Sequence, residues 1–84
     1  MGISGNFIMS LNEQVSKILE NFDGTSSGEI IDVLKQIQPQ FKSNLTSEYL
    51  DGKIQKIVDV EDESEKKKQC KALTPYLDWY LQGL

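Results

Sequence analysis

Oxygen-bearing side chains recur at alternate positions within residues 21–30, which read NFDGTSSGEI. Asp23, Thr25 and Ser27 stand two residues apart, and Gly28 follows them directly. A loop of this spacing could offer a calcium ion a carboxylate, two hydroxyls and a glycine for the sharp turn. The chemistry that these residue types suggest is therefore cation binding.

The same segment resembles the calcium loop of an EF-hand. Phe22 would end the preceding helix, Asp23 would hold the first ligand position and Ile30 the apolar eighth position. The twelfth position of that loop carries a bidentate glutamate, but this sequence has Leu34 there. One carboxylate supplies too little charge to offset the dehydration of a cation, so the resemblance implies at most a degenerate calcium module.

The segment also has the pattern of a helix start. Ser26 and Glu29 stand three residues apart, as in a capping box. In that motif the serine side chain accepts from the glutamate amide and the glutamate side chain reaches back. Leu34 then belongs to the apolar face of the helix that follows. We favour this interpretation, in which residues 21–30 are a turn between two packed helices, and we predict no bound metal.

Composition excludes most enzyme classes. The 84 residues include no histidine, and all nine basic residues are lysines. Histidine-based nucleophile pairs, histidine general bases and the usual zinc sites are therefore absent from the sequence. Without arginine there is no guanidinium clamp on phosphate or guanine, and the net charge of −4 disfavours a nucleic-acid partner. We predict a protein that is not an enzyme and uses no cofactor.

The length and the ends of the sequence indicate one small cytoplasmic domain. Residues 1–10 lack the charged start and long apolar core of a signal peptide, and no apolar run approaches the roughly 18 residues of a membrane span. Cys70 is the only cysteine, so no internal disulfide can form. We expect residues 1–5 to be a flexible lead or an expression remnant and residues 6–84 to form a single helical domain.

Apolar residues at helical spacing predict the first two helices. The first could start at Ser10, which has capping-box spacing with Glu13, or near Asn6, and it would end at Asp23-Gly24 with the glycine left-handed. Pro39 limits the second helix to about residue 38. The first stripe comprises Leu11, Val15, Ile18, Leu19 and Phe22, and Phe7 and Ile8 continue it upstream. The second stripe comprises Ile30, Val33, Leu34, Ile37 and Phe41.

The third segment admits two interpretations. Leu50, Ile54, Ile57 and Val58 suit a helix that starts near Thr46, but Asp51-Gly52 in its middle is a strong hairpin signal. A hairpin would pair Tyr49 with Ile54 and Leu45 with Val58 on one face. We favour the helix. The predicted fold is therefore all-α, a compact antiparallel bundle of four or five short helices, and the alternative is α+β with a hairpin at residues 45–58.

A charged block precedes the last segment. Acidic residues come first and lysines follow, which suits a helix that starts near Asp62 and is supported by pairs such as Glu63–Lys67. The block could be an acidic docking patch that mimics DNA, or Lys66–Lys71 could bind phosphate. We favour a solvated helix start. The candidate docking residues are Asp59, Glu61, Asp62, Glu63, Lys66 and Lys67.

The end of the chain carries the candidate binding residues. Thr74-Pro75 has the pattern of a helix cap followed by a proline at the first helical position, which predicts a kink or a break there. It interrupts an apolar stripe that consists of Cys70, Leu73, Leu77, Tyr80, Leu81 and Leu84. Neighbouring lysines could activate Cys70, but its place on the stripe favours a core residue.

Trp79 is the only tryptophan, and a straight helix would direct it outward beside Asp78, whereas a break at Pro75 could bury it as a lid on the core. Tryptophan and tyrosine are enriched among binding hot spots. We therefore predict an adaptor, inhibitor or immunity-type neutraliser that binds another protein, or a second copy of itself, through Tyr76, Asp78, Trp79 and Tyr80. The alternatives are a nucleic-acid-linked regulator and the degenerate calcium module.

Overall fold

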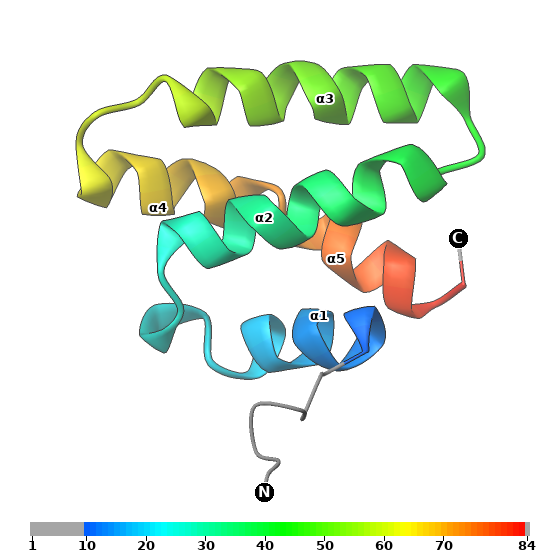
Figure 1. Cartoon of the computed structure of the whole chain (residues 1–84), viewed down its shortest axis with the longest axis horizontal. Coiled ribbons are helices and arrows are strands. Elements are labelled where there is room, and N and C mark those ends of the chain that lie inside the picture. The colour runs from blue at the N-terminus through cyan, green and yellow to red at the C-terminus, as the bar shows by residue number, and fades with distance from the viewer. Residues whose placement is uncertain (1–9, 84) are drawn as a thin grey trace, which may run out of the picture.

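Short helices make up most of the chain, as the computed structural model of residues 10–83 shows (Figure 1). The prediction of an all-α fold is confirmed, with five α-helices and no strand among the described residues. The elements in chain order are α1 (Leu11–Glu20), the 3-10 turn η2 (Phe22–Gly24), α2 (Ser27–Ile37), the 3-10 turn η3 (Gln38–Gln40), α3 (Asn44–Val58), α4 (Glu63–Ala72) and α5 (Thr74–Leu81).

Side-chain caps start four of the helices. Ser10 caps α1 in a complete capping box: the Glu13 amide donates to the Ser10 hydroxyl, and the Ser10 amide donates to the Glu13 carboxylate. Ser26 caps α2 as predicted, but the Glu29 carboxylate accepts from the Ser26 hydroxyl at 3.3 Å instead of from its amide. Asp62 caps α4, and Ser43 caps α3, so that α3 starts at Asn44, two residues before the predicted start near Thr46. The predicted starts at Ser10, Ser26 and Asp62 are therefore confirmed, whereas an earlier start at Asn6 lies outside the described residues.

The predicted glycine stop of the first helix is wrong. The helix α1 ends at Glu20, and Gly24 belongs to η2. Among residues 10–83 the glycine with positive φ is Gly83, at 99°. The Asn21 carbonyl accepts from the Gly24 amide at 3.1 Å and from the Thr25 hydroxyl at 2.8 Å. This turn satisfies the end of α1 without a left-handed residue.

The helix α3 runs through Asp51-Gly52, so the hairpin alternative is wrong. Burial of Leu50, Ile54 and Ile57 on one side explains why the helix wins, because a hairpin would place Leu50 and Ile57 on the face opposite Ile54. Val58, which we placed on the same stripe, is 40% exposed. At about 100° per residue Val58 is rotated roughly 80° from Leu50, at the edge of the buried face.

The break at Pro75 is confirmed, and it separates α4 from α5. Proline has no amide hydrogen to donate to the carbonyl of Lys71, four residues earlier. The Thr74 hydroxyl donates to that carbonyl instead, at 2.9 Å. Leu73 is the N-cap of α5 and Thr74 is its first residue, so the prediction of Thr74 as the cap is wrong. At the other proline, α2 ends at Ile37 and Pro39 lies in η3, as predicted.

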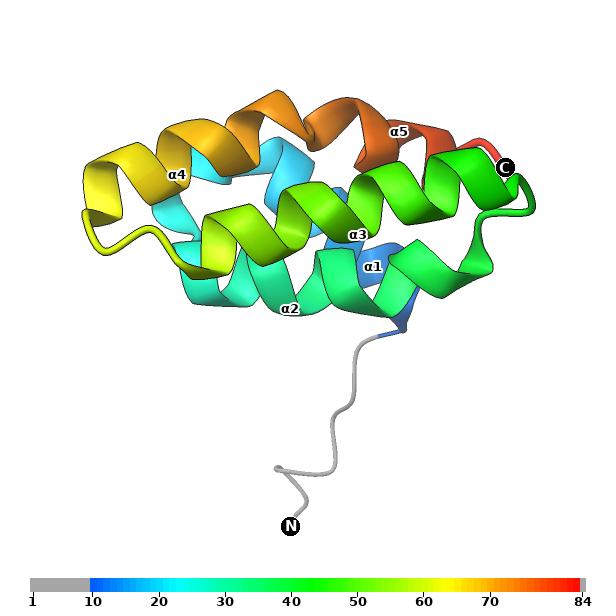
Figure 2. The same cartoon turned by 90° about the horizontal axis from the view of Figure 1, so that it is seen from above.

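The central helix is α2, which packs against each of the other four α-helices. The helices α1 and α3 lie on opposite sides of it in Figure 1. Seen from above, α3 runs beside α4, and α5 continues the line of α4 towards the C-terminus (Figure 2). The core includes Ile31, which our sequence analysis did not select, and the predicted Phe7, Ile8 and Leu84 lie outside the described residues.

Candidate functional site

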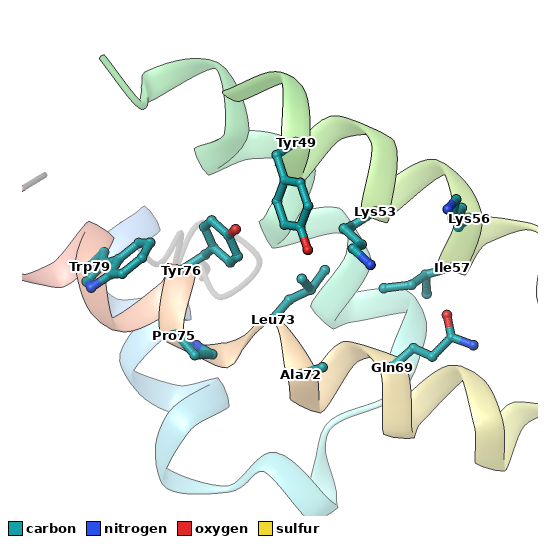
Figure 3. Close-up of a pocket in the computed structure, with 10 residues that line it drawn as sticks. All are labelled: Tyr49, Lys53, Lys56, Ile57, Gln69, Ala72, Leu73, Pro75, Tyr76 and Trp79. Atoms are coloured by element: carbon teal, nitrogen blue, oxygen red, sulfur yellow. The ribbon is translucent and has the colours of Figure 1, made fainter. Parts of the chain in front are cut away.

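A groove of about 450 Å³ lies between α3 and the α4–α5 pair (Figure 3). We call it the aromatic groove, and Ile57 and Leu73, both buried, belong to its lining. Its walls carry Tyr49, Lys53 and Lys56 from α3, and Tyr76 and Trp79 from α5. Gln69, Ala72 and Pro75 complete the lining.

Helical geometry explains why these side chains meet. Lys53 follows Tyr49 by four residues, and Lys56 follows Lys53 by three. The three side chains therefore share one flank of α3, beside the buried stripe that begins at Leu50. Tyr76 and Trp79 are three residues apart and share one flank of α5. The groove is formed where these two flanks face one another.

Aromatic rings form a continuous cluster at one end of the groove. The Tyr76 ring meets Trp79 edge to face, with centroids 5.2 Å apart, and meets Phe41 in the same way at 5.8 Å. A smaller hollow of about 280 Å³ lies beyond the indole and is lined by Phe41, Lys42, Thr46 and Trp79, together with Ser43. Trp79 therefore borders two adjoining hollows, and its ring is held by Tyr76.

Large apolar side chains remain exposed along this face. Trp79 is 49% exposed and Tyr49 is 55% exposed, although each lines the groove. Leu45, one helical turn before Tyr49 on α3, is 81% exposed. Large apolar side chains that gather at the surface in this way are a feature of interaction sites in soluble proteins.

Lysines supply the charge around the groove. Among residues 10–83, the charged side chains that line the aromatic groove and the smaller hollow are Lys42, Lys53 and Lys56. The Lys53 amine lies 5.4 Å from the centroid of the Tyr49 ring, within range of a cation–π contact. Burial, followed by the influence of Tyr49, raises the pKa of the Tyr76 hydroxyl. The hydroxyl therefore stays protonated at neutral pH.

The four predicted binding residues fall in different places. Tyr76 and Trp79 line the groove, so the lid position that we considered for Trp79 is not adopted. Tyr80 packs partly buried against the core. Asp78 is exposed on another flank of α5, because consecutive helical residues project about 100° apart. Its carboxylate accepts from the side-chain amide of Gln82 at 3.0 Å.

Two members of the charged block join α4 to the turn between α1 and α2. The Glu63 carboxylate accepts from the Ser27 hydroxyl at 2.8 Å, and the Lys67 amine donates to the Asp23 carbonyl at 3.2 Å. The same amine lies 5.1 Å from the centroid of the Phe22 ring. Glu63 and Lys67 therefore have contacts within the fold and do not form the local pair that we predicted.

The other members of the block lie at the surface. Asp59, Glu61 and Asp62 are exposed between α3 and α4, and Asp62 accepts from the Glu65 amide as the cap of α4. Lys66 is half-buried. A docking role for this block stays a prediction.

The candidate thiol and the candidate cation ligands are both engaged in the fold. Cys70 is fully buried, and burial, with Glu63 beside it, raises the thiol pKa against the opposing effect of Lys66 and Lys67. The prediction of a core residue is confirmed.

The Thr25 hydroxyl donates to Asn21, and Ser27 donates to Glu63, so these two oxygens point to separate partners. Leu34, at the twelfth loop position, is in the core.

Sequence reasoning missed Tyr49, Lys53 and Lys56 as groove residues. The signal was present in the helical interpretation of α3, because Leu45 and Tyr49 lie off the stripe of Leu50 and Ile54 and so have no core position to fill.

Comparison of the chain with known protein families, with characterised proteins and with solved structures finds no match. The groove and its side chains are therefore the basis for a functional proposal. Within residues 10–83, no helix is long and apolar enough to cross a membrane, and no group of three or more acidic or cysteine side chains could hold a metal ion.

Proposed function

We propose that this chain is a small cytoplasmic interaction module that binds another protein through the aromatic groove. The observation that carries the proposal is the pair of half-exposed aromatic side chains, Tyr49 on α3 and Trp79 on α5, that line one groove from two different helices. Side chains of this type dominate the binding energy of protein interfaces when a partner covers them.

The groove has the construction of a preformed interface. Its backbone belongs to packed helices, and the Tyr76 ring holds the indole of Trp79 in place by an edge-to-face contact. A site of this kind loses little conformational entropy on binding, because its side chains are already ordered. Such a module would act as an adaptor or inhibitor by occupying the surface of its partner.

The experiment is affinity capture from an extract of the source organism, with partners identified by mass spectrometry. The wild-type chain, Trp79→Ala and Asp78→Ala serve as baits, since the second substitution changes another flank of the same helix. We expect one partner that the wild type and Asp78→Ala retain and Trp79→Ala loses. Equal recovery by all three baits would show that the groove is not the binding surface.

A further inference from the structure

Three polar groups of the aromatic groove can donate hydrogen bonds to an occupant, beside the Gln69 side-chain amide, which already donates to Glu65. The hydroxyls of Tyr49 and Tyr76 and the amine of Lys53 turn into the groove (Figure 3). Among residues 10–83 neither hydroxyl has a hydrogen-bond partner, and the contact of the Lys53 amine is with the face of the Tyr49 ring. The electrostatic influence of Tyr49 is also the second cause, after burial, of the raised Tyr76 pKa.

A carboxylate is the group that suits these three donors. It accepts hydrogen bonds at two oxygens, and its charge complements the ammonium group of Lys53. Lys56 and, beyond Trp79, Lys42 add positive charge to the linings of the two hollows. Glu48 lines an adjoining shallow hollow that shares Tyr49, Lys53 and Lys56 with the groove, and Glu65 accepts from the side chain of Gln69, but neither carboxylate belongs to the lining of the groove itself. The groove is therefore locally basic in a chain of net charge −4.

The shape of the site suits a helix. Parallel or antiparallel helices that pack side by side leave a groove along their axes, and in a bundle a further helix fills it. The aromatic groove runs between α3 and α4–α5 in this way (Figure 3). The smaller hollow shares Trp79 with the groove and lies on the other side of the indole. Apolar side chains at helical spacing on a partner could enter the two hollows on either side of the indole.

We propose that the occupant is an acidic amphipathic helix of another protein, in which a carboxylate lies among apolar side chains on the binding face. The carboxylate accepts hydrogen bonds from Tyr49, Tyr76 and Lys53, and the apolar side chains pack against Leu73 and Trp79. This inference rests on the proposed function and adds to it the chemical class of the partner.

The test is a selection from a display library of randomised helical peptides of about 15 residues, or roughly four turns. The immobilised full chain is the target, and every enriched peptide is measured again against Trp79→Ala. We expect peptides that need Trp79 and carry Asp or Glu between apolar residues at helical spacing. In the tightest peptide, replacing that acid with its amide should weaken binding about tenfold, as loss of a charge-assisted hydrogen bond would.

A double-mutant cycle locates the carboxylate. Lys53→Gln and Tyr49→Phe should each remove most of the preference for the acid over the amide, whereas Lys35→Gln, an exposed lysine of α2 away from the groove, should preserve it. An equal preference in all three variants would place the carboxylate elsewhere and overturn the assignment.

The outcomes separate the two proposals. Peptides that need Trp79 but are neutral or basic would overturn the acidic helix and leave the interaction module intact. If no enriched peptide depends on Trp79, both proposals fail. Light scattering provides the remaining check: a dimer of the wild type that Trp79→Ala converts to a monomer would show that a second copy of the chain covers the groove, against the inference.

Discussion

Replacement of Gly52 by alanine should stabilise the protein. Gly52 is exposed in the interior of α3, and a Cβ atom built on it meets no atom within 4 Å beyond its chain neighbours and the local helix backbone. The substitution therefore changes only the helix propensity of the position and the entropy of the unfolded chain. The expected gain in free energy of unfolding is about 0.5–1 kcal/mol. For a domain of this size a gain of 1 kcal/mol raises Tm by roughly 4–8 °C.

Urea denaturation followed by circular dichroism measures this gain, and the m-value should not change. Gly83→Ala is the matched control, because Gly83 has a φ of 99° and likewise has open space around its Cβ position. Alanine is strained in that conformation and should give no gain. A loss of stability in Gly52→Ala would refute the helical conformation of residues 51 and 52 and restore a turn there.

Three further predictions concern the turn, the core and the thiol. Ser26→Ala should cost about 1 kcal/mol through the lost cap of α2, with or without millimolar calcium, whereas a rise in Tm with calcium that Asp23→Ala abolishes would support the cation loop. Leu77→Ala should lower the free energy of unfolding by about 2–5 kcal/mol, because Leu77 is fully buried, and a cost below 1 kcal/mol in urea denaturation would contradict its core position. The raised pKa of Cys70 means that the folded chain holds the thiol proton more tightly than the unfolded chain, so its contribution to stability is complete below the ordinary pKa of 9.0 and is lost as pH rises through the folded value. Wild type should therefore lose more stability than Cys70→Ala between pH 8 and pH 11, and parallel pH profiles for the two proteins would contradict the assignment.

The starts of α1, α2 and α4 could be predicted from the sequence because capping is local. A side chain and an amide three residues apart decide each start, so Ser10, Ser26 and Asp62 could be identified without tertiary information. The true end of α1 at Glu20 could not be predicted in this way. It is followed by a turn in which the Thr25 hydroxyl donates to the Asn21 carbonyl, and no spacing in the sequence predicts that hydrogen bond.

The candidate site was predictable only on the side that comes from the last helix. Tyr76 and Trp79 attract attention by residue type, whereas Tyr49 gains its place only because α4 packs beside α3 and α5 supplies the rest of the facing wall. The same holds for Glu63, whose partner Ser27 lies 36 residues away in the chain. Spacing within one helix shows which residues share a flank, but it does not show which other helix faces them.

The most direct test of the interaction module is the affinity of the captured partner for the wild-type chain and for Trp79→Ala. The substitution should cost the fold about 2–3 kcal/mol, because Trp79 is only half-buried and its ring meets that of Tyr76 edge to face. Calorimetry on the folded variant should then show binding weaker by about 2 kcal/mol or more, a roughly 30-fold rise in Kd. A Kd within about twofold of wild type, a difference of roughly 0.4 kcal/mol, would contradict the claim that the partner binds in the aromatic groove.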